Sequence, residues 1–101
     1  MKFLIIRLSS IGDIVLTTPV IRCLKNTLPD AEIHYLAKAS FTNILSENPY
    51  ITQLHAWGKN EKEILDELKK ENIDYIVDLH HNLRTLRIRR FLNPAEHFSF
   101  P

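Results

Sequence analysis

The chain has 101 residues, of which 45% are hydrophobic and 25% charged, and its formal net charge is +1 at pH 7. This composition is that of an ordinary globular domain and excludes a disordered or fibrous protein. The near-neutral charge excludes a general attraction to nucleic acid, while a peripheral membrane contact through a local patch stays open. The single cysteine, Cys23, excludes an internal disulfide and indicates a reduced, cytoplasmic setting.

The first part of the chain predicts a buried strand followed by two helices. Residues 3–6 form a continuous apolar run, which is typical of a strand buried on both faces of a parallel sheet. This run is too short for the core of a signal peptide and for a membrane span. A short helical turn is predicted near residues 13–17 and a helix over residues 19–28, with Thr18 as N-cap and Pro19 as first helical residue.

The rest of the chain continues the alternation of strands and helices. Strands are predicted over residues 32–36, 51–57 and 73–79, and a fifth strand begins within 96–100. Between them lie a short helix with Phe41, Ile44 and Leu45 on one face, a helix over 61–72 with a stripe of Ile64, Leu65 and Leu68, and a helix over 82–92 with Leu83, Leu86 and Leu92 inward. We therefore expect an α/β fold over residues 1–101: an open, mostly parallel, Rossmann-like sheet with helices on both faces.

The first candidate site is the turn after the first strand, since ligands of open parallel sheets bind beyond the carboxyl ends of the strands. Ser9, Ser10 and Gly12 are small residues that let the backbone turn tightly and approach a ligand. Asp13 has two interpretations: a base that takes a proton from a sugar hydroxyl, or the N-cap of the next helix. The turn matches neither the three-glycine dinucleotide motif nor a P-loop, and we expect no cofactor.

The second candidate site follows the fourth strand, at residues 78–82, and includes His80, His81 and Asn82. Adjacent histidines point in different directions and lack the spacing of a known metal-binding motif, so no metal site is predicted. Contact with a polar ligand and a plain turn remain as interpretations.

The third candidate site is a run of four arginines in the last helix: Arg84, Arg87, Arg89 and Arg90. Positions 84 and 87, and positions 87 and 90, are neighbours on a helix surface. At least three guanidiniums can therefore face one anionic partner, and a solvated charged face is the alternative interpretation.

Two segments resemble a known family. Residues 5–22, IIRLSSIGDIVLTTPVIR, resemble the N-terminal signature of the ADP-heptose:lipopolysaccharide heptosyltransferases, which are bacterial enzymes. Residues 78–85, DLHHNLRT, resemble the family's second N-terminal motif, with His81 where the family often has glycine. The resemblance implies an inverting glycosyltransferase of the two-domain GT-B type that works without a metal-binding Asp-x-Asp motif.

The resemblance also implies roles for individual residues. Asp13 matches the proposed catalytic base, and Ser9, Ser10 and Gly12 match the loop that shapes the acceptor side of the cleft. We add the hypothesis that Asn82, Arg84 and Arg87 contact the phosphates or carboxylates of a lipopolysaccharide core acceptor. ADP-heptose would bind the C-terminal domain of such an enzyme, which has no counterpart in these 101 residues.

The resemblance and the length of the chain lead to further expectations. It forms part of the N-terminal, acceptor-side domain and transfers no sugar by itself, because half of a two-domain site cannot align donor and acceptor. The uncovered edge of its sheet promotes self-association. The alternative is a stand-alone, non-catalytic Rossmann-like module that binds an anionic glycolipid or a nucleotide.

Overall fold

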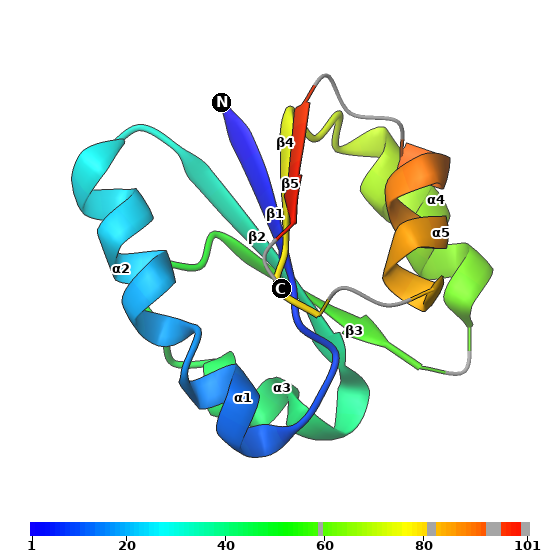
Figure 1. Ribbon diagram of the computed structural model, residues 1–101, viewed down its shortest axis with the longest axis horizontal. Coiled ribbons are helices and arrows are strands. Elements are labelled where there is room, and N and C mark those ends of the chain that lie inside the picture. The colour runs from blue at the N-terminus through cyan, green and yellow to red at the C-terminus, as the bar shows by residue number, and fades with distance from the viewer. Residues whose placement is uncertain (59, 81–82, 93–95, 100–101) are drawn as a thin grey trace.

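The computed structural model describes residues 1–58, 60–80, 83–92 and 96–99, with side chains for 1–58, 60–80 and 85–92. Five strands form one sheet (Figure 1). They are β1 (Lys2–Ile6), β2 (Glu32–Lys38), β3 (Gln53–Trp57), β4 (Tyr75–Asp78) and β5 (Glu96–Ser99). Their order is β3-β2-β1-β4-β5, and each neighbouring pair is parallel, which confirms the predicted open parallel sheet.

Helices cover both faces of this sheet, as Figure 1 shows. One face carries α1 (Ile11–Val15), α2 (Thr18–Thr27), the 3₁₀ turn η1 (Ala39–Phe41) and α3 (Thr42–Leu45). The other face carries α4 (Glu61–Lys70) and α5 (Leu83–Leu92). The chain runs outward from β1 to β3, then returns to place β4 on the other side of β1. The topological switch point, where such sheets bind ligands, therefore lies between β1 and β4.

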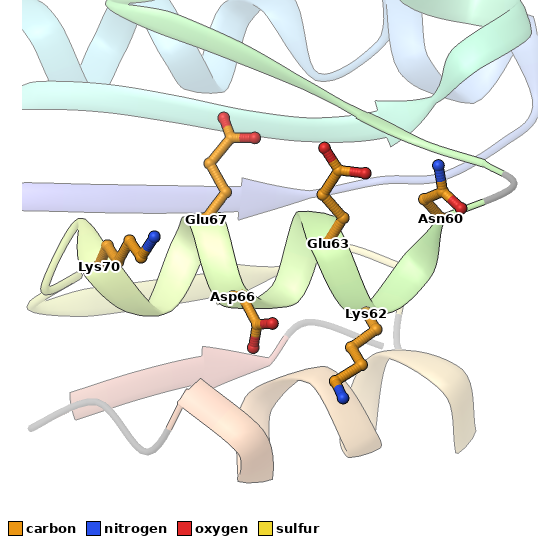
Figure 2. Close-up of a pocket in the computed structure, with 6 residues that line it drawn as sticks. All are labelled: Asn60, Lys62, Glu63, Asp66, Glu67 and Lys70. Carbon is orange, nitrogen blue, oxygen red and sulfur yellow. The ribbon is translucent and has the colours of Figure 1, made fainter.

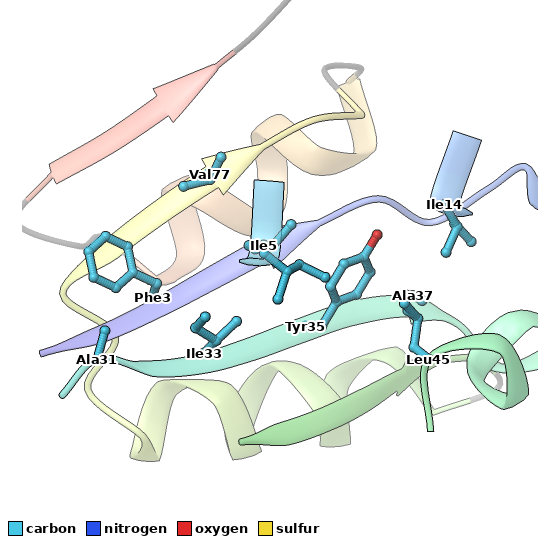
Figure 3. Close-up of a cluster of buried hydrophobic side chains, with 10 residues drawn as sticks. Phe3, Ile5, Ile14, Ala31, Ile33, Tyr35, Ala37, Leu45 and Val77 are labelled. Carbon is cyan, nitrogen blue, oxygen red and sulfur yellow. The ribbon is translucent and has the colours of Figure 1, made fainter. Parts of the chain in front are cut away.

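Alternate residues of the strands enter two separate hydrophobic cores. The core beneath α1, α2 and α3 contains Phe3, Ile5, Ile14, Ile21, Ile33, Tyr35 and Leu45 (Figure 3). The core beneath α4 and α5 contains Leu4, Ile6, Leu36, Leu68, Ile76 and Ile88. This double burial explains why β1 reads as an unbroken apolar run. In the described part of the chain, no helix has the length and apolar character needed to cross a bilayer.

The helical details correct two sequence predictions. The second helix begins at Thr18 rather than Pro19, and its N-cap residue is Thr17. Thr18 does not cap this helix, because its hydroxyl donates to the Val15 carbonyl oxygen at 2.9 Å. Ile44 is exposed although it was expected on a buried face, since the tighter 3₁₀ turn of η1 precedes α3 and changes the direction of its side chains.

The last helix follows the predicted bounds but only part of the predicted face. Thr85 and Ile88 are its buried residues, and Leu92 packs against the same core as predicted, whereas Leu86 is only partly buried and is not part of that core. The leucine spacing missed this face because a buried threonine carries no hydrophobic signal. The side chain of Leu83 lies outside the described residues.

A chain of hydroxyl groups fixes the junction between α1 and α2. The Tyr35 hydroxyl and the Thr17 Oγ1 lie 2.8 Å apart, and Thr17 Oγ1 donates to the Ile14 carbonyl oxygen at 2.6 Å. Tyr35 must therefore be the donor to Thr17. Both side chains are buried, and burial raises the pKa of Tyr35 to about 12. The hydroxyl remains protonated at neutral pH and ties β2 to the helical junction.

A double-mutant cycle tests this hydroxyl chain. Thr17→Val leaves the buried Tyr35 hydroxyl without its acceptor, which costs about 1–3 kcal/mol in the free energy of unfolding. In a Tyr35→Phe background the same change is expected to cost less, because no hydroxyl is then left unpaired. Urea denaturation measures the four proteins, with Thr27→Val on the exposed end of α2 as control. Strictly additive effects would contradict the hydroxyl chain.

Two histidines are buried side by side between the sheet and α4. His34 Nδ1 and His55 Nε2 are 3.0 Å apart, and His55 Nδ1 lies 3.1 Å from Glu67 Oε1. Figure 2 shows Glu67 extending from α4 towards the strands. Burial lowers the pKa of His55, and His34 lowers it further, although Glu67 and Glu71 act in the opposite direction. Folded His55 therefore binds a proton less readily than unfolded His55.

This difference predicts a fall in stability at mildly acidic pH. The unfolded chain takes up more protons at His55, so the free energy of unfolding rises with pH across this titration. The contribution is present above the unfolded pKa of His55, about 6.5, and is lost as the pH falls below it. Urea denaturation at pH 8 and pH 5.5 should show a smaller loss for His55→Gln than for the wild type. An equal loss in both proteins would refute the assignment to His55.

Candidate active site

Two turns meet at the switch point between β1 and β4. Ile6 lies opposite Asp78 in the sheet, so Arg7 and Leu79 are the next residues at the same edge. The Leu79 amide donates to the Ile6 carbonyl oxygen at 3.0 Å, and the Arg7 amide donates to the Leu36 carbonyl oxygen at 3.2 Å. The backbone of both turns is thus held firmly where each leaves its strand.

The Arg7 side chain connects the two turns. Its Nη1 donates to the Leu79 carbonyl oxygen at 2.8 Å, and its Nη2 lies 2.9 Å from Asp13 Oδ2. Arg7 continues the alternation of Phe3 and Ile5, so its side chain leaves the strand on the face that carries α1. One guanidinium therefore contacts both loops that border the switch point.

Asp13 lies in the first turn of α1 and is not its N-cap. The N-cap residue is Ser10, whose Oγ donates to Asp13 Oδ2 at 2.8 Å. The helix-cap interpretation of Asp13 is therefore wrong. The Ser10 hydroxyl and, next, the Arg7 guanidinium lower the pKa of Asp13 below its ordinary value. Asp13 is consequently ionised at neutral pH, and its side chain is 49% exposed.

The two donors leave one side of this carboxylate open. The Ser10 hydroxyl and Arg7 Nη2 both bind Oδ2, and the Ser10 backbone makes a further hydrogen bond to the carboxylate; among the described residues no side-chain donor binds Oδ1. A hollow of about 220 Å³ borders the carboxylate and is lined by Arg7, Asp13, Leu16, Thr17, Val20 and Leu79. The geometry suits an oxygen that accepts a proton from a polar ligand seated in this hollow.

Gly12 and Ser9 also lie at this site. Gly12 is inside α1, and no glycine among the described residues has a positive φ, so Gly12 does not provide the tight turn expected from the sequence. A Cβ added at Gly12 would meet no atom within 4 Å, so the backbone there faces open space. Ser9 is half-buried, and its peptide bond to Ser10 is cis.

Apolar surface surrounds the charged groups of the site. Ile11, Val15 and Leu16 of the α1 segment are exposed, and Leu16 is 73% exposed. An apolar groove of about 520 Å³ begins at Val20 and runs between α2 and the sheet, lined by Phe3, Pro19, Val20, Cys23, Leu24, Thr27 and Val77. The site therefore combines one ionised carboxylate with extensive apolar surroundings.

The end of β4 is built around a buried ion pair. The carboxylate of Asp78 is fully buried: Oδ1 accepts from the His80 amide at 3.0 Å, and Oδ2 lies 3.2 Å from Arg89 Nε. Arg89 is thereby directed to the sheet with a 10% exposed side chain, while Arg87 and Arg90 are exposed. Among the described side chains of the arginine run, Arg89 is therefore structural, whereas Arg87 and Arg90 face solvent.

Part of the second and third candidate sites lies outside the described residues. Asn82 and His81, and the side chain of Arg84, lie outside the described residues. Arg84 is the second residue of α5, at the same edge of the sheet as Asp13, and Arg87 follows one turn later. Among the described residues, no three His, Cys, Asp or Glu side chains are placed to hold a metal ion.

A larger hollow lies away from these groups. It measures about 610 Å³ and runs along α4, lined by Asn60, Lys62, Glu63, Asp66, Glu67 and Lys70 (Figure 2). The α4 helix covers the opposite face of the sheet from α1, so this polar hollow does not communicate with Asp13. It is an open helix surface, and the switch point remains the candidate site.

The role of Arg7 was not predicted from the sequence, where this residue stands only within the family-like segment 5–22. The available signal was a charged residue directly after the apolar run, on the strand face that the following helix covers. The backbone carbonyl of Leu79, the second partner of Arg7, had no signal in the sequence.

Comparisons with known proteins give consistent matches. No family model matches the chain. Lipopolysaccharide heptosyltransferase 1 of Campylobacter coli is 32% identical over 106 residues, covering 99% of this chain and 31% of that protein. Lipopolysaccharide heptosyltransferase 3 of Escherichia coli K12 is 37% identical over 78 residues, covering 67% of this chain and 23% of that protein.

Solved structures agree with the sequence relatives. The crystal structure of the glycosyl transferase family 9 from Veillonella parvula matches with a TM-score of 0.84 and 25% identity, covering 97% of this chain and 32% of that one. E. coli heptosyltransferase WaaC with ADP matches with a TM-score of 0.87 and 19% identity, covering 99% and 34%. By sequence and fold, the chain is a relative of the lipopolysaccharide heptosyltransferases and spans about a third or less of their length.

Proposed function

We propose that the chain is the acceptor-side part of an inverting heptosyltransferase that moves heptose from ADP-heptose to an inner-core lipopolysaccharide sugar. The observation that carries this proposal is the ionised Asp13 carboxylate, which has one open oxygen at the switch point of the sheet. The relatives support the substrate class by their names. The parallel sheet supports a place within a GT-B enzyme.

In the proposed reaction, an acceptor hydroxyl lies against Asp13 Oδ1. As the acceptor oxygen attacks the anomeric carbon, its O–H bond breaks and the proton passes to Oδ1. The bond between the anomeric carbon and the phosphate oxygen of ADP breaks on the opposite side, so the configuration inverts. The low pKa of Asp13, set by Ser10 and Arg7, keeps the carboxylate ionised. The proton therefore transfers as attack develops and not beforehand.

The other proposed contacts concern acceptor binding. Ser9 and Gly12, which flank Ser10 and Asp13 in sequence, are proposed to shape the acceptor side of the site, and exposed Arg87, with Arg84 and Asn82, to contact anionic groups of the acceptor. The exposed apolar residues around Asp13 support an amphipathic lipopolysaccharide acceptor. We accordingly propose a cytoplasmic location in peripheral contact with the inner membrane.

The donor is proposed to bind a second domain outside these 101 residues. The chain spans about a third of its relatives, and a GT-B site is assembled between two domains. We therefore expect the chain alone to transfer no sugar. Self-association through the edge of its sheet is part of the same proposal.

Transfer of heptose from ADP-heptose to a deacylated inner-core acceptor tests the proposed function. In the full-length protein that carries this segment, Asp13→Asn is expected to lower kcat by about 100-fold or more, because a general base contributes about 10²–10⁴-fold. The matched control is Asp30→Asn, an exposed aspartate in the turn after α2. Normal turnover by Asp13→Asn would contradict the role of Asp13. Acceptor binding without turnover by any form would favour the binding-module alternative.

A further inference from the structure

We propose that Arg7 is the positioning residue for Asp13: it holds carboxylate oxygen Oδ2 and thereby presents Oδ1 to the acceptor hydroxyl. This inference rests on the function proposed above. Its basis is the geometry of one guanidinium that binds the two turns at the switch point. Nη1 is 2.8 Å from the Leu79 carbonyl oxygen, and Nη2 is 2.9 Å from Asp13 Oδ2.

The orientation of Arg7 is determined at both ends of its side chain. The backbone is held in the sheet by the hydrogen bond from the Arg7 amide to the Leu36 carbonyl oxygen. The tip is held by Leu79, which itself bonds to β1 through the Ile6 carbonyl oxygen. With its base and tip fixed, the guanidinium provides a rigid donor to which Asp13 aligns.

The burial of Arg7 supports a specific placement. The side chain is only 21% exposed, and its Nε is buried without a hydrogen-bond partner among the described residues. A buried donor left unpaired costs about 1–3 kcal/mol. The two terminal nitrogens, by contrast, both have partners on neighbouring segments, which fixes the plane of the guanidinium.

Both side-chain donors of Asp13 bind oxygen Oδ2, and this determines the direction of Oδ1. Ser10 approaches Oδ2 from the N-terminus of α1, and Arg7 approaches it from β1. Rotation of the carboxylate would break both bonds, so Oδ1 remains the open oxygen. When Oδ1 takes the acceptor proton, the adjacent positive charge of Arg7 favours its release after the product leaves. The carboxylate is then ready for another reaction.

Lysine could supply the charge of Arg7 but not its geometry. A guanidinium is planar and offers parallel N–H groups at fixed separation, whereas an ammonium is a compact point charge on a flexible stem. Arg7→Lys should therefore preserve electrostatic stabilisation of the carboxylate better than its orientation. Arg7→Met removes both while retaining an apolar stem of similar length.

Titration of the 101-residue chain tests the contact without requiring turnover. Carboxyl-detected NMR follows Asp13 in the wild type, Arg7→Met and Arg7→Lys, and amide spectra verify that each is folded. The pKa of Asp13 should rise in Arg7→Met and return towards the wild-type value in Arg7→Lys. An unchanged pKa in folded Arg7→Met would overturn the proposal.

Transfer kinetics of the full-length protein test the positioning role. Arg7→Met should lower kcat by about 10–100-fold, since a displacement of about 1 Å at a reacting group can cost 10²-fold. The KM for ADP-heptose should stay unchanged, Arg7→Lys should recover part of kcat, and Arg22→Met, an exposed arginine of α2, should match the wild type.

The outcomes separate this inference from the proposed function. If Arg7→Met keeps its kcat while Asp13→Asn loses it, Asp13 is the base and Arg7 does not position it. If Asp13→Asn retains full kcat, the proposed function fails, and the positioning role fails with it. Loss of kcat in Arg7→Met without a shift in the pKa of Asp13 would also overturn the inference, because Arg7 would then act elsewhere.

Discussion

The guanidinium of Arg7 joins two turns whose residues are 72 positions apart in the sequence. Parallel sheets bring such turns together because all carboxyl ends of the strands meet at one edge. At the switch point, however, the chain leaves β1 and β4 towards opposite faces, so no helix or strand of the described residues spans the gap. Arg7 makes this connection with two terminal nitrogens, and the position of the Asp13 carboxylate depends on it.

Buried polar contacts support this site from beneath. Tyr35 and Thr17 bind the junction of α1 and α2 to β2, so the helix that carries Asp13 is anchored to the sheet. On the other face, Asp78 and Arg89 fasten α5 to the end of β4, beside the Leu79 carbonyl that Arg7 contacts. Tyr35, Thr17 and Asp78 are buried, and a buried polar group that loses its partner is costly. These polar contacts therefore help to fix the positions of the two turns that border the site.

Much of the fold could be predicted because its signals are local. The apolar run of β1, the stripe of α4 and the alternation of elements specify a parallel sheet covered on both faces. The site was predictable only in part. The turn containing Ser10 and Asp13 stood out after a buried strand, but the Arg7 contact depends on the β1–β4 pairing, and its partner is a backbone oxygen. The sequence also could not show that Arg89 is buried while Arg87 and Arg90 are exposed, because the partner of Arg89 is Asp78 at the end of β4.

A crystal structure of the proposed two-domain enzyme with a deacylated inner-core acceptor and a non-transferable 2-fluoro donor analogue tests the account most directly. The account predicts an acceptor hydroxyl within hydrogen-bond distance of Asp13 Oδ1, with Oδ2 still bound to Ser10 and Arg7 and with Arg7 still on the Leu79 carbonyl. An acceptor hydroxyl placed on a different base, or on Oδ2 with Arg7 turned away, would contradict it.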